Sequence, residues 1–239
     1  MIDPPLPPEP DNDDERPYSD EVRSFGRRRA RKPGPRQQRL WDERLPDLAV
    51  DLSRPIAAQI PANTAQLWLE IGFGGAEHLL WQAKQNPHAL LIGCEPFEDG
   101  VMKALSGIDD DQLSNIRLHV DDARPLLRWL PEACLDMAFI LFPDPWPKRR
   151  HVKRRLVSPA TLDLLARVMK PGAQLRIGTD IGDYARTILL AITGHKDFVW
   201  PASGPQDWRV RGDDWPSTRY EQKAIREGRP RYYFRFQRA

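Results

Sequence analysis

The segment Phe142-Pro-Asp-Pro-Trp-Pro-Lys148 combines residue types that chemistry on a nucleic-acid base requires. Asp144 stands between two prolines, and because each proline fixes its own φ, the carboxylate has few directions in which to point. Trp146 offers a surface on which a base can stack, although the same ring would serve equally well as an anchor in the core. A fixed carboxylate beside an aromatic ring predicts an enzyme that acts on a nucleic-acid base.

A strongly basic stretch follows, with six Lys or Arg residues in the eight positions from Lys148 to Arg155. Such a run is often a solvated protein surface, but its position beside Asp144 favours neutralisation of RNA phosphates. We interpret His151 as part of the same basic surface and not as a catalytic base.

A glycine-rich turn lies earlier in the chain, in Leu69-Glu-Ile-Gly-Phe-Gly-Gly75. Glycines allow the backbone to turn tightly and to approach a ligand closely. A dinucleotide-binding fingerprint would need a third glycine at position 77, where this chain has Glu77, and a glutamate there would repel a pyrophosphate. Glu70 and Glu77 instead favour a cationic ligand without phosphate, and S-adenosylmethionine, with its ammonium and sulfonium groups, fits that description.

Two further acidic positions suit a nucleoside ligand. Glu95 follows Ile92-Gly-Cys94 and lies 23 residues after Gly72, near the spacing of about 20 residues at which an acid binds ribose hydroxyls. Asp121 and Asp122 follow the next apolar run, where a carboxylate would accept a hydrogen bond from an adenine amino group. Each acid alone is typical of a solvated helix N-cap, whereas acids at three successive strand ends indicate a ligand site.

The hydrophobic pattern predicts strands and helices that alternate from residue 65 onward. Because helices separate the strands, we predict a doubly wound α/β fold with a mostly parallel seven-stranded sheet and helices on both faces. Such sheets bind ligands beyond the carboxyl ends of their strands, which is where the glycine turn, the acids and Asp144 all fall. The predicted strands are 66–71, 90–94, 116–120, 135–142 and 174–178, and the predicted helices are 76–85, 97–105, 123–129, 159–169 and 183–193.

The C-terminal residues 231–236 alternate in a pattern that is typical of a half-buried strand. We expect this strand to be antiparallel and to lie at the end of the sheet. The preceding segment Thr218-Arg-Tyr-Glu221 is expected to be a loop that reaches the target nucleotide. Residues 200–217, which contain three tryptophans, are expected to form an ordered loop, and their role does not follow from the sequence.

Charge is distributed unevenly along the chain, although the formal net charge is only +2. Residues 1–22 are acidic and rich in proline, so we expect a disordered tail. Residues 23–60 begin with a basic arm, which is either a solvated linker or a segment that orders on RNA, and continue into a lead-in helix. Residues 61–239 are expected to form the catalytic domain.

Composition also indicates the size of the core and the cellular compartment. Hydrophobic residues make up 40% of the 239, enough for a sizeable core. Cys94 and Cys134 both stand in apolar runs and are expected to be buried thiols, as in a reducing cytoplasm.

No apolar run approaches the roughly 20 residues that span a bilayer, and the acidic N-terminus is unlike a secretory signal. No clustered His or Cys spacing indicates a metal site. We therefore expect a cytoplasmic protein with neither membrane nor metal.

Five segments together resemble the bacterial tRNA (guanine-N7)-methyltransferase family of class I S-adenosylmethionine-dependent enzymes. They are residues 69–74, 92–95, 142–148, 178–180 and 218–221. The resemblance covers roughly residues 23–239, and the proline-flanked aspartate and the Thr-Arg-Tyr-Glu segment are its specific parts. One departure is Ala76, where many class I methyltransferases have a third glycine. Since alanine is small, we expect only a slight backbone adjustment there.

The resemblance implies a tRNA partner, a Rossmann-like fold, S-adenosylmethionine as cofactor, and methylation of a guanine N7 in the variable loop. The cofactor-binding residues that it implies are Glu70, Gly72, Gly74, Glu95, Asp122 and Asp144. The implied substrate-binding residues are Lys148, Asp180, Thr218, Arg219, Tyr220 and Glu221. The implied RNA-interaction residues are Arg150, His151, Lys153, Arg154 and Arg155. Asp122 matches rather than Asp121, because the family's acid immediately precedes the alanine.

Guanine N7 carries a lone pair and no proton, so its methylation needs no general base. The main task of the enzyme is to align N7 with the methyl carbon. Because the product ring is positively charged, a nearby carboxylate stabilises the developing charge, and Asp144 is the predicted catalytic residue. Asp180 would supply a second acceptor to the guanine edge, unless it caps the following helix.

Three other functions stay open at this point. A methyltransferase of exocyclic amines has a similar loop rich in proline and aromatic residues, but usually places two prolines together after its acid or amide. A non-catalytic RNA-binding protein on the same fold would lack an intact set of cofactor acids, which this chain has. A nicotinamide-dependent oxidoreductase is disfavoured by Glu77.

The basic stretch generates a first prediction. Binding of tRNA should weaken steeply with salt, since each phosphate contact by Lys or Arg releases a counterion. Six such contacts would lower the affinity by about 10³-fold between roughly 50 and 200 mM salt. Filter binding over that range measures the slope, and an affinity that stays constant would contradict phosphate neutralisation.

Overall fold

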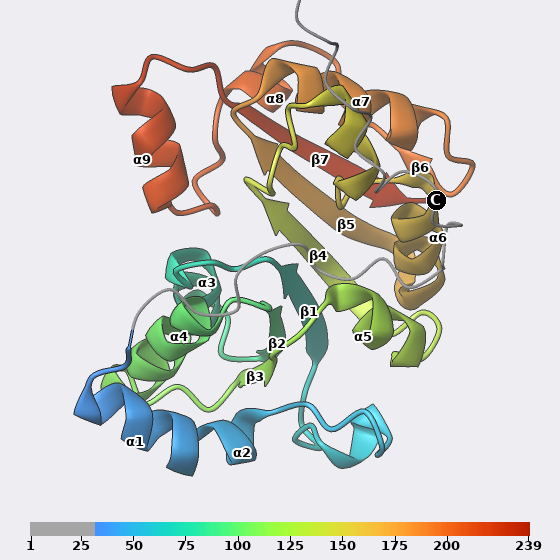
Figure 1. The fold of residues 1–239 in the computed structure, drawn as a ribbon. Helices are drawn as coiled ribbons and strands as arrows, with labels where there is room; N and C mark the ends of the chain where they lie inside the picture. Colours follow the sequence, from blue (N-terminus) through green and yellow to red (C-terminus); the bar gives the residue numbers. More distant parts are fainter. Residues whose placement is uncertain (1–31) are drawn as a thin grey trace, which may run out of the picture.

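Strands and helices alternate from β1 onward in the computed structural model, which describes residues 32–239 (Figure 1). The predicted acidic tail, residues 1–22, and the start of the basic arm, residues 23–31, lie outside the described residues. The strands are β1 Gln66–Ile71, β2 Ala89–Cys94, β3 Ile116–His119, β4 Leu135–Leu141, β5 Met169–Thr179, β6 Phe198–Val199 and β7 Tyr232–Arg238. The α-helices are α1 Pro35–Glu43, α2 Leu45–Leu48, α3 Glu77–Gln85, α4 Glu98–Asp110, α5 Ala123–Trp129, α6 Pro159–Val168, α7 Gly182–Thr193, α8 Gln206–Arg209 and α9 Arg219–Arg226, and the 3-10 helices are η2 Ile56–Ala58 and η3 Arg149–Arg154.

The strands form one seven-stranded sheet in the order β3-β2-β1-β4-β5-β7-β6. The strands from β3 to β5 pair in parallel, and β7 pairs antiparallel with both β5 and β6. The doubly wound, mostly parallel fold predicted from the sequence is therefore confirmed, including the antiparallel C-terminal strand. The expected place of that strand at the end of the sheet is wrong, because the short β6 pairs with its outer side.

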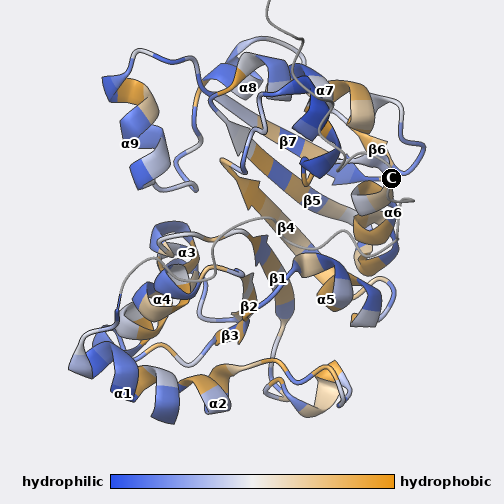
Figure 2. Ribbon diagram, viewed as in Figure 1, coloured by the Kyte–Doolittle hydropathy of each residue, from blue (hydrophilic) through white to orange (hydrophobic). Residues whose placement is uncertain are grey.

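Helices cover both faces of the sheet, and successive strand residues point to opposite faces. On one face, Leu67, Leu69 and Ile71 of β1 share a core with apolar residues of α5, α6 and α7. On the other face, Trp68 packs with apolar residues of α1, α3 and α4. Glu70 points to this second face although it is an acid, and only 2% of it is exposed. Figure 2 shows hydrophobic residues along β1 and β4 and hydrophilic residues over much of α1.

The described N-terminal helices pack on the same core. Leu40 of α1 and Leu48 of α2 are buried in the cluster that α4 shares. Arg36 of α1 also pairs with Asp109 and Asp110 near the end of α4, at 2.7 and 2.6 Å. The described part of residues 23–60 is therefore anchored to the predicted catalytic domain through α4.

The parallel register places the loops after β1, β2, β4 and β5 at one edge of the sheet. Leu141 at the end of β4 pairs with Gly178 of β5. Backbone hydrogen bonds continue this pairing into the loops: Gly72 N donates to Cys94 O at 2.8 Å, and Phe142 N donates to Gly178 O at 2.7 Å. The loops that carry the predicted site residues therefore begin side by side.

Both cysteines are free thiols, as the sequence predicts, but only Cys94 is fully buried, and Cys134 is half-buried. Burial raises the pKa of Cys94 well above its usual value and raises the pKa of Cys134 to about 11. Both sulfurs therefore stay protonated at neutral pH, where an unreactive thiol is the expected form. None of the helices within residues 32–239 is long and apolar enough to cross a membrane.

Candidate active site

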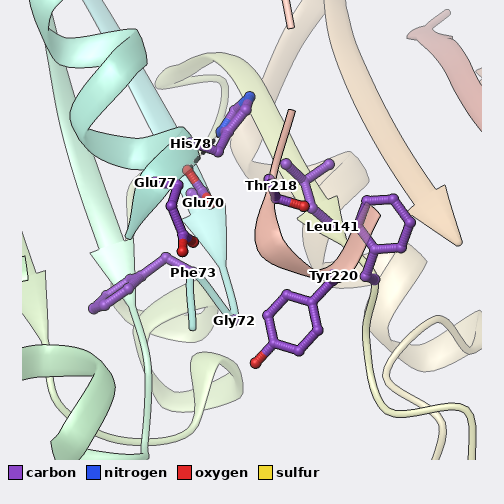
Figure 3. A pocket seen from close by; sticks show the side chains of 9 residues that line it. Glu70, Gly72, Phe73, Glu77, His78, Leu141, Thr218 and Tyr220 are labelled. Atoms are coloured by element: carbon purple, nitrogen blue, oxygen red, sulfur yellow. Dashed lines mark hydrogen bonds and ion pairs between the residues drawn. The ribbon is translucent and has the colours of Figure 1, made fainter. Parts of the chain in front are cut away.

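A pocket opens where the loops after β1 and β4 meet the start of α9 (Figure 3). Acids, aromatic rings and a histidine line it, together with the backbone of the glycine turn. The lining residues are Glu70, Gly72, Phe73, Glu77, His78, Leu141, Phe142, Thr218 and Tyr220. In Figure 3 the side chains from β1 and α3 face Thr218 and Tyr220, so the pocket joins the predicted cofactor side to the predicted substrate side.

The glycine turn after β1 uses left-handed backbone conformations. Gly72 and Gly74 have φ angles of +75° and +54°, which glycine adopts without a steric cost. Ala76 has a φ of +65° although it carries a Cβ, and it is fully buried at the start of α3. Alanine thus takes the conformation that a glycine would adopt there, at a cost of about 1–2 kcal/mol.

Glu95 holds the glycine turn against the end of β2. Its Oε2 accepts a hydrogen bond from Gly74 N at 2.8 Å, and its Oε1 accepts one from Phe97 N at 3.0 Å. Burial raises the pKa of this carboxyl, the two N–H groups oppose the rise, and the charge of Asp144 adds to it. The predicted ribose-binding acid therefore also fixes the turn and lies within electrostatic reach of Asp144.

Gly100 of α4 lies directly behind this turn. A Cβ at this position would overlap the carbonyl oxygen of Gly74 and would lie 3.2 Å from Glu95 Cγ. Because glycine has no Cβ, α4 can approach the turn this closely. Gly100 is therefore a part of the site that sequence reasoning missed.

Glu70 is bound inside the interface between the sheet and α3. His78 Nδ1 lies 2.8 Å from Glu70 Oε2, and the two side chains are only 1% and 2% exposed. The other ring nitrogen of the histidine, Nε2, lies 3.1 Å from Gln82 Nε2. A buried carboxylate at the wall of a pocket suits a cationic group of a ligand, because low polarity strengthens their attraction.

Asp122 follows β3 and caps α5. Its Oδ1 accepts a hydrogen bond from Arg124 N at 2.8 Å, and its Oδ2 pairs with Arg124 Nη1 at 2.7 Å. The N-cap role that the sequence left open is therefore observed. An ionised carboxylate has about four acceptor positions, so these two bonds leave capacity for an adenine amino group.

Asp144 lies in a loop whose two ends have unusual backbone conformations. Phe142 and Trp146 have φ angles of +50° and +43°, a region that residues with a Cβ rarely adopt and that is often found at functional sites. Pro143 and Pro145 restrict the backbone between them. Asp144 reaches solvent, yet partial desolvation by its surroundings raises the pKa of its carboxyl.

Trp146 packs against the basic helix η3. Arg154 lies over its ring, with Cζ 5.1 Å from the centroid, and the His151 ring meets it edge-on at 5.7 Å. Desolvation and the surrounding cations lower the pKa of His151. The tryptophan therefore anchors η3, and its stacking on a base stays a prediction. The exposed cations of this stretch are Lys148, Arg149, Arg150 and Lys153.

The prediction that Arg155 belongs to the RNA-binding surface is wrong, because this residue is buried and only 3% exposed. Its guanidinium donates to Pro145 O at 2.9 Å and to Thr187 Oγ1 at 2.6 Å, and it pairs with Asp183 Oδ2 at 2.5 Å. It also lies over the ring of Tyr184, with Cζ 4.8 Å from the centroid. Arg155 thus fastens the loop of Asp144 to α7 and does not face phosphates.

Residues 218–221 open α9 and do not form the loop that we expected. Thr218 is the N-cap, and its Oγ1 accepts a hydrogen bond from Glu221 N at 3.3 Å. Both residues are buried, at 6% and 4% exposed. Glu221 Oε1 accepts hydrogen bonds from Tyr233 Oη at 2.5 Å and from Arg211 Nε at 3.1 Å. Glu221 therefore anchors α9 to β7, and of these two only Thr218 reaches the pocket.

Arg219 and Tyr220 lie over the glycine turn. A Cβ at Gly74 would lie 3.1 Å from the ring of Tyr220, and a Cβ at Gly75 would overlap the guanidinium of Arg219. Arg219 Nε pairs with Glu77 Oε1 at 2.5 Å, which offsets the negative charge at the start of α3. These two predicted substrate residues are therefore neighbours of the predicted cofactor turn.

Asp180 pairs with Arg229, which precedes β7, and Arg229 also pairs with Glu227 at 2.7 Å. Asp180 does not cap α7, since the N-cap of that helix is Ile181 and no side-chain bond closes it. Asp180, the predicted acceptor for the guanine edge, is thus already paired with Arg229. A substrate would have to share the Asp180 carboxylate with this arginine.

Four residues that build the site were missed by sequence reasoning: His78, Gly100, Trp215 and Arg229. Trp215 is 1% exposed and lies between His78 and Tyr233, with ring centroids 6.3 and 5.5 Å away. Each of the four has at least one partner from a distant segment, and no local pattern reveals those contacts, although His78 also contacts Gln82 of its own helix and Arg229 also pairs with nearby Glu227. The start of α9 did carry a local signal, because Thr-x-x-Glu is the pattern of a helix capping box.

The residues at this edge fit S-adenosylmethionine. Buried Glu70 offers a negative charge to a cationic group, and Glu95 stands beside the backbone turn that a ligand would approach. The start of α3 carries Glu77, which disfavours a phosphate at that helix N-terminus. Within residues 32–239, no three side chains of His, Cys, Asp or Glu are close enough to hold a metal ion.

Comparisons with known proteins agree with this geometry. A family model described as "Putative methyltransferase" matches residues 64–234. An antibiotic-related methyltransferase of known structure has a TM-score of 0.52 at 18% identity and covers 74% of this chain and 89% of its own. TrmN from Thermus thermophilus has a TM-score of 0.53 at 18% identity over 77% of this chain and 47% of its own. Fold and family model define a class I S-adenosylmethionine-dependent methyltransferase.

Curated relatives narrow this class. The tRNA (guanine-N(7)-)-methyltransferase of Hyphomonas neptunium is 48% identical over 89% of this chain and 98% of its own length. The enzyme of the same name from Rhodospirillum rubrum is 46% identical over 92% of this chain and 89% of its own length. The chain therefore belongs to the tRNA (guanine-N(7)-)-methyltransferase family, and the resemblance that its motifs indicate is confirmed.

The close approach of α4 to the glycine turn can be tested with Gly100→Ala. The new Cβ would overlap the Gly74 carbonyl, a backbone atom, so the turn must shift and overpacking should cost about 1–3 kcal/mol. We expect affinity for S-adenosylmethionine, measured by calorimetry, to fall about tenfold or more.

Gly107→Ala in the same helix is the matched control. The three atoms nearest to its Cβ would all belong to the flexible end of the Leu80 side chain and none to the backbone of the turn, so affinity should stay near the wild-type value. Equal cofactor affinity in the two variants would show that Gly100 has no special role.

Proposed function

We propose that this chain transfers the methyl group of S-adenosylmethionine to N7 of a guanine in the variable loop of tRNA, forming 7-methylguanosine. The observation that carries the proposal is the proline-flanked Asp144 within electrostatic reach of Glu95 at one edge of the sheet, in a chain of this family. Relatives named tRNA (guanine-N(7)-)-methyltransferase cover 89–92% of the chain. The partner is therefore tRNA and the cofactor is S-adenosylmethionine.

Bound S-adenosylmethionine supplies an electrophilic methyl carbon, and the residues of the chain bind and orient the reactants. Glu70 provides the negative charge for a cationic group, and Glu95 provides acceptors for the ribose hydroxyls. Asp122 accepts from the adenine amino group with the capacity that its two bonds to Arg124 leave. The left-handed turn at Gly72 and Gly74 allows close approach of the backbone. The assignment of these residues to the cofactor is part of the proposal.

Asp144 acts through its charge and its position. Guanine N7 has a lone pair, so no group has to remove a proton before the bond forms. Positive charge develops on the ring as N7 gains the methyl group, and a fixed carboxylate stabilises that charge. Asp144 is held in place without substrate by the two prolines and the strained ends of its loop. The bonds of Arg155 to Pro145 and Asp183 also hold this loop. Such preorganisation is what alignment of the reacting atoms requires.

The substrate side lies between the basic stretch and α9. Exposed Lys148, Arg150 and Lys153 contact RNA phosphates in this proposal, together with His151 and Arg154. Asp180, Thr218, Arg219 and Tyr220 face the guanine and its nucleotide. Because Asp180 is paired with Arg229, guanine binding includes a rearrangement of that pair.

We also propose that residues 61–239 are the catalytic domain, with α1 anchored to it through α4. The reaction takes place in the cytoplasm in this proposal. Free thiols such as Cys94 and Cys134 are typical of that compartment.

The proposed function predicts the product of a methylation assay. Unmodified tRNA incubated with the protein and labelled S-adenosylmethionine should yield label in 7-methylguanosine after digestion and nucleoside analysis. A tRNA whose variable-loop guanine is replaced by adenine is the matched control and should stay unlabelled. Label in an exocyclic-amine product would favour that class of methyltransferase, and cofactor-dependent binding of tRNA without label would favour a non-catalytic protein.

Asp144→Ala and Asp144→Asn separate charge from hydrogen bonding. If charge stabilisation dominates, both should lower kcat by about 10²- to 10³-fold, because asparagine keeps an acceptor but no charge. Cofactor affinity should be retained in part in both variants, since Glu70, Glu95 and Asp122 stay in place. Wild-type turnover in either variant would refute the catalytic role.

The acid limb of the pH profile of kcat reports the same carboxyl. Desolvation raises the pKa of Asp144, so the carboxylate gains a proton, and loses its stabilising charge, at a higher pH than an ordinary aspartate. In wild type kcat should therefore fall on acidification above the usual aspartate range of about pH 3.9. A fall at or below that range would contradict a role for this raised pKa.

A further inference from the structure

Three buried polar side chains connect the candidate cofactor site to residues 200–217, the Trp-rich segment. The contacts run from Glu70 through His78 and Gln82 to the backbone of Asp214. The three side chains belong to residues that are 2–3% exposed. Burying a polar group this deeply costs free energy unless the group has a hydrogen-bond partner. Each donor should therefore face an acceptor, and the partners show which atoms carry the hydrogens.

The partners of Gln82 determine the orientation of its amide. Gln82 Nε2 lies 2.9 Å from Asp214 O, which can only accept. Gln82 Oε1 lies 3.0 Å from Asn86 Nδ2, which must be a donor because it also donates to the backbone Gln82 O at 2.9 Å. A flipped amide would place two acceptors together at Asp214 and two donors together at Asn86. Gln82 Nε2 is therefore the donor atom.

This orientation determines the tautomer of His78. Gln82 Nε2 lies 3.1 Å from His78 Nε2 and donates to it, so that ring nitrogen must accept. A neutral imidazole has one acceptor and one donor nitrogen, and the proton is therefore on Nδ1. His78 Nδ1 then donates to Glu70 Oε2 at 2.8 Å. The histidine is a neutral donor, so it orients the carboxylate without cancelling its charge.

Aromatic rings hold the imidazole in this position. Phe139 lies edge-on to it at 4.6 Å between centroids, and Trp215 at 6.3 Å. The carbonyl of Trp215 accepts from Arg211, which also donates to Glu221 at the start of α9. The acid of the cofactor site and the helix of the substrate side are thus joined by one series of contacts, which is buried from Glu70 to Gln82 and partly exposed at Arg211 (Figure 3 shows its Glu70–His78 end).

We propose that His78 is a positioning residue of the cofactor site: in the Nδ1–H tautomer that both Gln82 and Glu70 require, it holds the Glu70 carboxylate toward the cationic part of the methyl donor. Through Gln82 it also fastens this carboxylate to the segment at Asp214 and Trp215. This contact gives a role to the Trp-rich segment, which was expected to be a loop and contains the short helix α8. The inference rests on the proposed function, because it takes Glu70 as a cofactor acid.

Two substitutions at one position separate donation to Glu70 from packing. In His78→Asn the side-chain nitrogen takes the place of Nδ1 and keeps the bond to Glu70. In His78→Gln the amide reaches the place of Nε2 and leaves Glu70 Oε2 without this donor. Both variants remove the same ring from its contacts with Phe139 and Trp215, so each serves as the packing control of the other.

We expect His78→Gln to weaken binding of S-adenosylmethionine by about 10- to 100-fold, the usual effect of a lost hydrogen bond to a buried charge. His78→Asn should stay within about threefold of wild type, because the charged acceptor keeps a donor. In turnover, His78→Gln should raise KM for the cofactor more than it lowers kcat. Equal losses of cofactor affinity in the two variants would overturn the positioning role.

Calorimetry without tRNA keeps this test separate from the proposed function. A chain that binds S-adenosylmethionine with the expected variant pattern, yet forms no 7-methylguanosine, would contradict the reaction and leave the role of His78 standing. If the wild-type protein forms 7-methylguanosine but the two variants bind S-adenosylmethionine with equal affinity, the proposed reaction is supported and the role of His78 is contradicted.

The tautomer itself can be measured in the wild-type protein, so the inference does not depend on a variant that folds. In protein labelled with ¹⁵N-histidine, the His78 signals, assigned through their contacts to the Phe139 ring, should show a protonated Nδ1 and an unprotonated Nε2. In Gln82→Met the Nε2 signal should shift because its donor is lost, whereas Nδ1 should stay protonated because the Glu70 carboxylate still accepts from it. The opposite tautomer in wild type, or a doubly protonated ring at neutral pH, would overturn the inference.

Discussion

The parallel pairing of β1 with β2 and β4 is the constraint on which the other features of the site depend. It brings the glycine turn, Glu95 and the loop of Asp144 to one edge, although they are far apart in sequence. The register is maintained by burial on both faces of the sheet. A slip of one residue would move Leu69 from one core to the other and would place Glu70 in the apolar layer under α5 and α6.

Three of the acids at this edge, Glu70, Glu95 and Asp122, accept hydrogen bonds from the protein itself and are therefore held in place before any ligand binds. Glu95 accepts from two backbone N–H groups, Asp122 from its own helix, and Glu70 from His78. Carboxylates held in this way do not have to reorient when a cation or a hydroxyl arrives. Their partial burial strengthens the attraction for a cationic cofactor, and the same burial explains the raised pKa of Glu95.

The C-terminal part of the chain combines firm and exchangeable contacts. Glu221, buried between Tyr233 and Arg211, fixes the start of α9 to the sheet. The neighbouring pair of Arg219 with Glu77 is partly exposed, at 43% and 35% of the two side chains. Ion pairs near the surface contribute only about 0–1 kcal/mol, so replacing one by a contact with RNA costs little. An anchored helix with exchangeable charges at its start is suited to a substrate that must enter and leave.

The fold class, the glycine turn, the strand-end acids and the family could be predicted from the sequence, because hydrophobic periodicity, glycine, proline and short motifs are local patterns. Local patterns do not reveal which polar groups meet. Arg155 has the same sequence context as its exposed basic neighbours, and its acceptors on α7 and in the loop of Asp144 place it in the interior. The same holds for His78 and Gly100, and for the position of β7 inside the sheet. Their roles depend on partners from distant segments, which meet after the strands pair and water is excluded between them.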